Sequence, residues 1–166
     1  MPVRQLADDP ASSKFLWILN QVKNDTRKTE MKETTISIKN TTKGMLPRLP
    51  FLVIKEIKNT ILGKKYELSI AFVTPAVSKR ANTLYRKKNE PTDILSFSLE
   101  KNSGELMICL PRARAKAREF GMSYQNYLGF MFIHGMLHLK GYDHSSTMDK
   151  LEKKWCKRFN FTHPFL

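Results

Sequence analysis

The sequence predicts an α+β fold, in which a small mixed β-sheet packs against helices. Three observations support this fold class. Segments rich in β-forming residues come early in the chain, the longest apolar helical pattern comes late, and turn signals separate the segments. At 166 residues, 41% of them apolar and 27% charged, the chain is long enough to bury one hydrophobic core. We therefore expect one main domain.

The first 33 residues differ from the rest. A short helix capped near Ser13 is expected first, and the polar run at residues 23–30 is typical of a linker because it lacks an apolar period. The apolar residues around Trp17 are expected to dock on the domain or to belong to a partly disordered terminus. The predicted organisation is an N-terminal extension at residues 1–33 and a domain at residues 34–166.

Local patterns predict the elements of this domain. Alternating or β-rich composition predicts strands at residues 34–39, 66–73, 94–99 and 105–109. Thr74 is a suitable N-cap because Pro75 follows it, and the most apolar helix starts after Ser123 and ends before Gly141. With the apolar spacing of the other segments, the predicted helices cover about residues 51–61, 75–87, 111–120, 124–139 and 146–159.

The charge of the chain is strongly positive. It has 29 Lys and Arg against 15 Asp and Glu, a net charge of +14, which attracts polyanions such as nucleic acids, although solubility alone is the alternative explanation. Cys109 and Cys156 lack disulfide or metal-site spacing, so we expect no disulfide and a reducing, cytoplasmic setting. We expect no membrane span, because no apolar run approaches the roughly 20 residues that a span needs.

Three of the four histidines, His134, His138 and His144, lie within eleven residues. The four-residue interval places the first two on one helix face, one turn apart. Gly141 can end that helix and turn the chain, so that His144 approaches the same point. Three imidazoles leave one position of a tetrahedral ion open, which is typical of a catalytic zinc site. The alternative is three histidines with ordinary structural roles. The fourth, His163, is expected at the surface.

Two histidines at this interval on a helix are also typical of zincin peptidases. In those enzymes the residue after the first histidine is the glutamate that acts as the general base. Here that position is Gly135. The sequence therefore predicts a zincin-like metal-binding helix in a protein that is not a standard metallopeptidase.

Three segments carry a more specific signal. They are residues 82–86 (Asn-Thr-Leu-Tyr-Arg), 91–97 (Pro-Thr-Asp-Ile-Leu-Ser-Phe) and 134–144 (His-Gly-Met-Leu-His-Leu-Lys-Gly-Tyr-Asp-His). Their residues, order and spacing resemble the YbeY family of bacterial endoribonucleases that mature rRNA, and the resemblance covers about residues 34–160. Departures from the usual family residues at Ser98, Glu105 and Lys140 leave the histidines unchanged.

The resemblance implies a zinc-dependent endoribonuclease domain that cleaves single-stranded RNA. It implies one Zn²⁺ per chain, held by the three histidines. It also implies a role in 3′-end maturation of 16S rRNA and in ribosome quality control, with 16S rRNA and the 30S ribosomal subunit as partners. Two other functions stay open: a ribosome-assembly or RNA-binding factor with a structural zinc, and another zinc-dependent hydrolase.

Further residues are candidates for the chemistry. Arg86 is the predicted catalytic residue, because a guanidinium can bind two phosphate oxygens where negative charge develops; an ordinary basic residue at a helix end is the alternative. Asp143 and Asp93 are candidates to orient ligand histidines as acceptors, and Asp93 is equally suited to cap a turn. The basic residues predicted to contact RNA, or else to form solvated helix faces, are Lys79, Arg80, Lys87, Lys88, Arg112, Arg114, Lys116 and Arg118.

Overall fold

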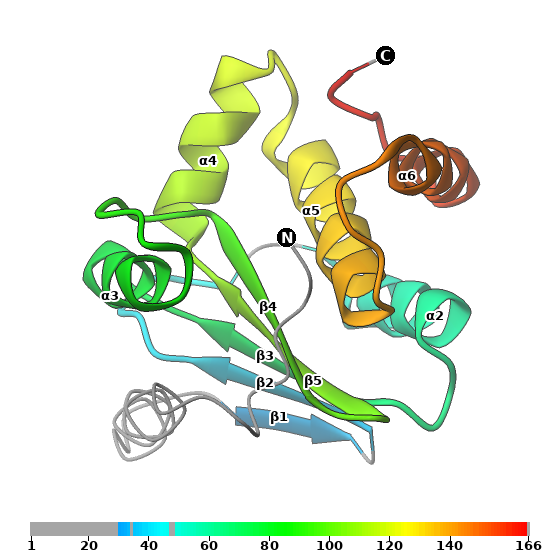
Figure 1. Ribbon diagram of the computed structural model, residues 1–166, viewed down its shortest axis with the longest axis horizontal. Coiled ribbons are helices and arrows are strands. Elements are labelled where there is room, and N and C mark those ends of the chain that lie inside the picture. The colour runs from blue at the N-terminus through cyan, green and yellow to red at the C-terminus, as the bar shows by residue number, and fades with distance from the viewer. Residues whose placement is uncertain (1–29, 34, 47–48, 166) are drawn as a thin grey trace.

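The computed structural model describes residues 30–33, 35–46 and 49–165, whose strands form one mixed sheet with helices on both faces (Figure 1). The predicted α+β class is confirmed, and the short helix expected near Ser13 lies outside the described residues. The strands are β1 (Glu30–Glu33), β2 (Ile36–Asn40), β3 (Glu67–Phe72), β4 (Ile94–Glu100) and β5 (Ser103–Ile108). The helices are α2 (Phe51–Ile61), α3 (Pro75–Arg86), α4 (Leu110–Glu119), α5 (Tyr124–Leu139) and α6 (Ser146–Arg158).

The five strands lie in the order β1-β2-β3-β5-β4. The pairs β2–β3 and β3–β5 are parallel, whereas β1–β2 and β4–β5 are antiparallel. From the sequence, residues 30–33 are assigned to the N-terminal extension, with a polar linker at residues 23–30, whereas in the structure Glu30 pairs with Lys39 and Glu33 pairs with Ile36, so these four residues belong to the sheet. β1 is an edge strand, paired on one side only. Edge strands are often polar, so a strand at this position can have the polar composition that is also typical of a linker.

Alternating side chains of the central strands build two cores. On β5, Leu106 and Ile108 belong to the larger core, which packs against α2, α4, α5 and α6. Met107 and Cys109 point to the opposite face and belong to the smaller core, which packs against α3. Because side chains alternate along a strand, the sheet separates α3 from the other helices, as Figure 1 shows.

Helix α5 is the most deeply buried helix. Its N-cap is Ser123, whose side chain accepts from the backbone N–H of Asn126, as the sequence predicts. At Gly135 the helix lies directly on the sheet: a Cβ atom there would lie 2.6 Å from Cδ1 of Ile94 and 2.9 Å from Cδ2 of Leu106. A side chain at this position would therefore displace Ile94 and Leu106, so glycine lets α5 pack closely on β4 and β5.

Cys109 and Cys156 are both buried and free. Among the helices that the structure describes, none is long and apolar enough to cross a membrane.

Candidate metal centre

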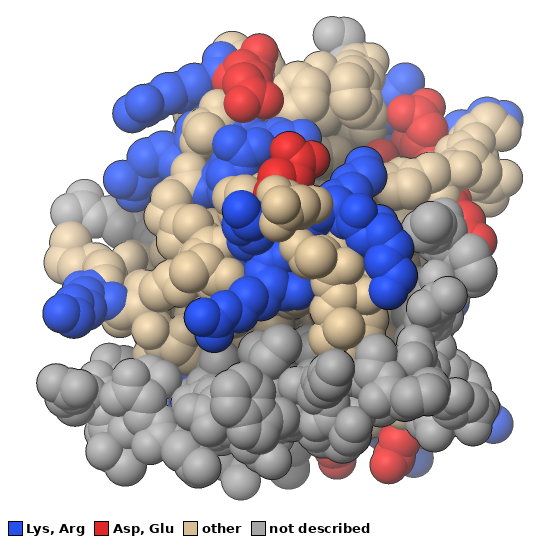
Figure 2. Space-filling model, turned by 60° about the vertical axis from the view of Figure 1, so that its left-hand side comes forward, with Lys and Arg blue, Asp and Glu red and all other residues tan. Residues whose placement is uncertain are grey.

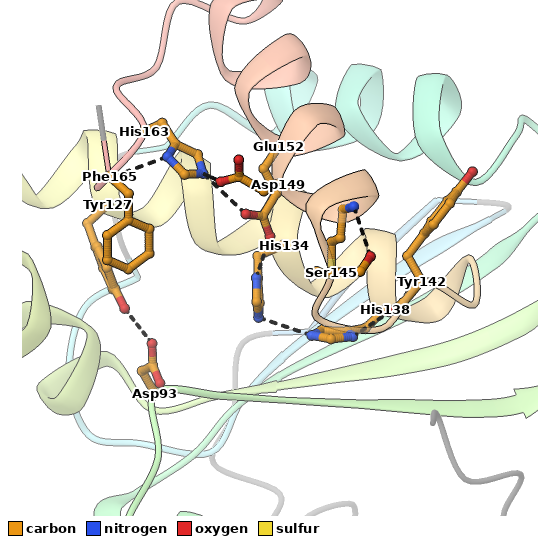
Figure 3. A network of polar contacts seen from close by, with 11 residues as sticks. Asp93, Tyr127, His134, His138, Tyr142, Ser145, Asp149, Glu152, His163 and Phe165 are labelled. Carbon is orange, nitrogen blue, oxygen red and sulfur yellow. Dashed lines mark hydrogen bonds and ion pairs between the residues drawn. The ribbon is translucent and has the colours of Figure 1, made fainter. Parts of the chain in front are cut away.

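The C-terminal part of α5 and the loop after it bring three histidines together. His134 and His138 lie one turn apart, with their Nε2 atoms 3.1 Å from each other (Figure 3). After the helix, Gly141 has a φ of 99°, in the left-handed region that favours glycine, and the chain turns back there. The ring centroid of His144 then lies 5.2 Å from that of His134 and 4.7 Å from that of His138. The structure thus forms the cluster that the spacing predicts.

Two acceptors orient the rings on α5. Nδ1 of His134 lies 2.7 Å from Oε1 of Glu152 on α6, and Nδ1 of His138 lies 2.9 Å from the carbonyl oxygen of Tyr142. A carboxylate and a carbonyl only accept hydrogen bonds, so each Nδ1 carries the proton and donates it. The Nε2 lone pairs are then available to a metal ion, which is the usual arrangement of histidine ligands. Two ligand atoms at about 2.0–2.1 Å from a tetrahedral zinc lie roughly 3.3 Å apart, close to the observed Nε2 separation.

The electrostatics of the cluster favour the neutral forms of His138 and His144. Burial, with the nearby His134 and His144, lowers the pKa of His138 to about 4. Burial and His134 also lower the pKa of His144. Burial alone would raise the pKa of Glu152, but hydrogen bonds and charges from His134 and His163 outweigh it, so this pKa is lowered. Metal binding needs neutral histidines and an ionised acceptor behind them, and the shifts of His138, His144 and Glu152 are in these directions.

The cluster is open on one side. His138 is buried at 6% exposure, the His134 side chain is 19% exposed and His144 is exposed. All three line a cleft of about 440 Å³. Three histidines that border a cleft can bind a metal ion and leave a position for a substrate or water, whereas structural zinc sites are closed by four protein ligands.

Arg86 and Asp93 also line this cleft. Arg86 is the last residue of α3, and its charge contributes to the lowered pKa values of His138 and His144. Asp93 attracts Arg86 electrostatically, and its Oδ2 accepts a 2.6 Å hydrogen bond from the hydroxyl of Tyr127. Asp93 therefore joins the start of β4 to α5 and places a negative charge beside Arg86.

Some of the residues predicted to contact RNA line the cleft in the structure, and others lie outside it. Figure 2 shows Lys and Arg side chains gathered on the side of the molecule that carries α3 and α4. Three of the eight predicted residues, Lys88, Arg112 and Lys116, line the cleft together with Arg86. The others are exposed and lie outside the residues described as lining the cleft: Lys79, Arg80, Lys87, Arg114 and Arg118.

Sequence reasoning missed Glu152 and misplaced His163. The prediction that His163 lies at the surface is wrong: it is 1% exposed and contacts Glu152. Glu152 stands between Met148 and Cys156 on the buried face of α6. An acidic residue at an apolar position of an amphipathic helix is the signal that was available for it. Asp143 is exposed beside His144, and its orienting role stays a prediction.

Known proteins resemble this chain over most of its length. The family model described as endoribonuclease YbeY matches residues 21–160. A protein named endoribonuclease YbeY from Macrococcus caseolyticus is 33% identical over 117 residues, which are 63% of this chain and 76% of that protein. Its namesake from Bacillus mycoides is 39% identical over 116 residues, 61% of this chain and 74% of that protein.

A protein from Thermotoga maritima with a known solution structure is 31% identical, with a TM-score of 0.48, over 64% of this chain and 78% of that one. The family match spans well over half of the sequence and includes the three clustered histidines, Arg86 and Glu152. This chain therefore belongs to the endoribonuclease YbeY family.

Proposed function

We propose that this protein is a zinc-dependent endoribonuclease that cleaves single-stranded RNA. The observation that carries the proposal is the open cluster of His134, His138 and His144 in a cleft that four cationic side chains also line. Its relatives are named endoribonucleases, which supports RNA as the substrate. On the same family grounds, we propose 16S rRNA of the 30S subunit as the cytoplasmic substrate, with roles in 3′-end maturation and ribosome quality control.

The three histidines would hold one zinc ion per chain through nitrogen lone pairs. When bound, zinc supplies a Lewis acid and activates water at neutral pH. Glu152 keeps the proton of His134 on Nδ1, and the carbonyl of Tyr142 does the same for His138, so that both rings present Nε2 to the ion.

Arg86 has the position and the charge to stabilise the transition state. Phosphodiester cleavage builds negative charge on the phosphoryl oxygens, and a guanidinium can donate to two of them at once. Asp93, which lines the same cleft, attracts the Arg86 guanidinium electrostatically. Arg112 and Lys116, from α4, are suited to bind neighbouring phosphates in the same cleft.

Aromatic side chains at the cleft support a preference for single strands. Phe165 is 65% exposed, and its ring meets that of Phe120 edge to face at 5.4 Å. Both rings line the cleft that contains the histidines. Unpaired bases can stack on such rings beside a basic groove, whereas bases inside a duplex are not accessible.

The packing of Gly135 disfavours a peptidase. In zincins this position supplies the general base, but here it faces Ile94 and Leu106 of the sheet, which a side chain would displace. The cationic cleft is also better matched to a phosphodiester than to a peptide bond.

The test is cleavage of a labelled single-stranded RNA by zinc-loaded protein, with a duplex of the same sequence in parallel. We expect cleavage of the single strand, and its loss after chelation and in His134→Ala. Lys65→Ala is the matched control, because Lys65 is an exposed basic residue outside the cleft lining. RNA cleavage that persists in metal-free protein would contradict the proposal, and binding without cleavage would indicate a non-catalytic RNA-binding factor.

A further inference from the structure

A buried histidine from the C-terminal segment stands behind the metal centre. The side chain of His163 has no exposed surface, and its Nε2 lies 3.2 Å from Oε2 of Glu152 (Figure 3). The backbone N–H of Phe165 donates to Nδ1 of the same ring at 3.2 Å. Because a backbone N–H only donates, Nδ1 is the acceptor and Nε2 carries the proton. His163 therefore donates a hydrogen bond to Glu152.

Glu152 is thus shared between two histidines. Its Oε1 accepts from Nδ1 of His134, and its Oε2 accepts from Nε2 of His163. Asp149 lies one turn earlier on α6. Its Oδ1 is 3.8 Å from Nε2 of His163, which is too far for a hydrogen bond, so Nε2 donates to Glu152 instead. Both oxygens of this buried carboxylate are therefore held, so the carboxylate cannot rotate away from His134 without leaving a buried donor unpaired.

Packing holds the His163 ring in this place. The His163 ring meets the Phe130 ring edge to face, with 5.3 Å between the ring centroids. The centroid of the Phe130 ring in turn lies 5.7 Å from that of the His134 ring. Two residues before His163, Phe161 packs on Gly129 of α5, where a Cβ atom would lie 2.4 Å from its ring. The segment after α6 is thereby attached to the helix that carries His134 and His138.

We propose that His163 is a positioning residue of the metal centre, acting through Glu152 on the ligand His134. The C-terminal segment that provides it follows residue 160, where the match to the family model ends. The proposal rests on the metal-binding part of the proposed function and does not depend on RNA cleavage. Removing the direct hydrogen-bond partner of a histidine ligand, here Glu152, typically changes metal affinity by about 10–100-fold; His163 acts one contact further out, so its effect should be smaller.

The experiment measures zinc affinity of the full chain by competition with a chromophoric chelator. His163→Leu removes the donor, and His163→Gln keeps an amide N–H near the position of Nε2. We expect His163→Leu to bind zinc more weakly by up to about 10-fold, the lower end of the range for direct partners, and His163→Gln to recover most of that loss. Phe161→Leu is the matched control, because it loosens the same segment without removing a polar contact of Glu152. Urea unfolding of each variant shows which of them are folded.

A second measurement needs no variant. The ¹⁵N shifts of the imidazoles in the wild-type protein should report the proton on Nε2 in His163 and on Nδ1 in His134. The proposal is overturned if His163 carries its proton on Nδ1, or if folded His163→Leu binds zinc as tightly as the wild type. Two zinc ions per chain would also overturn it, because His163, Glu152 and Asp149 would then be ligands of a second ion. A protein that binds zinc as expected but cuts no RNA would refute the proposed function and leave this inference intact.

Discussion

Acidification of the metal-free protein should remove about 3 kcal/mol of folding free energy through His138 alone. Burial and two neighbouring histidines lower the pKa of His138 from 6.5 to about 4. Each pKa unit between the folded and unfolded states corresponds to about 1.4 kcal/mol, so this difference corresponds to about 3 kcal/mol. Above pH 6.5 the ring is neutral in both states, and no free energy is lost.

The folding free energy of the metal-free protein is lost in a defined direction and over a defined pH range. Between pH 6.5 and 4 the unfolded chain binds a proton at His138 that the folded chain does not, so stability falls as the pH falls through this window. His144 shifts in the same direction but is exposed, so its contribution should be small. The pKa of Glu152 is lowered from its ordinary value of 4.5, so Glu152 contributes to the loss of folding free energy only when the pH falls below about 4.5.

The assay is urea unfolding in the presence of a chelator at several pH values between 7.5 and 4, followed by circular dichroism. The comparison is between the wild type and His138→Gln, which cannot titrate in this range. The variant should lose much less stability over the window, whatever its stability at pH 7.5. Equal pH dependence of the two proteins would refute the assignment of a buried, neutral His138.

Three further predictions concern Gly135 on α5, Arg86 in the cleft and the exposed aromatic residue Phe165. Gly135→Glu should lower the free energy of unfolding by more than about 3 kcal/mol in urea, because it places an unpaired charge against Ile94; wild-type stability would contradict the described packing. Arg86→Ala should lower the RNA cleavage rate by about 10²–10³-fold while zinc content is unchanged; an unchanged rate would remove Arg86 from the mechanism. Phe165→Ala should weaken single-stranded RNA binding by about 1–3 kcal/mol in fluorescence anisotropy, with Phe165→Tyr near the wild type; equal affinities would exclude base stacking there.

The local parts of this structure could be predicted from the sequence. Caps at Thr74 and Ser123 and the glycine at position 141 depend only on neighbouring residues, and each has the expected role. The clustering of His134, His138 and His144 follows from helical periodicity and one turn, which are also local. For these features a short stretch of sequence contains all of the physical information.

The remaining features depend on contacts between distant segments. The polar strand β1 is stabilised by backbone pairing with β2, which its side chains do not reveal. The burial of His163 depends on how the chain after α6 folds back on α5. Likewise, whether a basic residue such as Lys116 or Arg118 borders the cleft depends on how α4 is rotated against the sheet, and both residues have the same charge in the sequence.

The metal centre and its supporting residues are confined to one short part of the chain. The three clustered histidines, Glu152 and His163 all fall between residues 134 and 163, on α5, α6 and the segments that follow them. Arg86 and the basic residues of α4 reach the cleft only when the sheet is complete. Short loops close at a small entropic cost, so little loop-closure entropy opposes bringing the groups of the metal centre together. A metal ion bound at this centre would stabilise the C-terminal quarter of the protein, and metal supply would then affect the yield of folded protein.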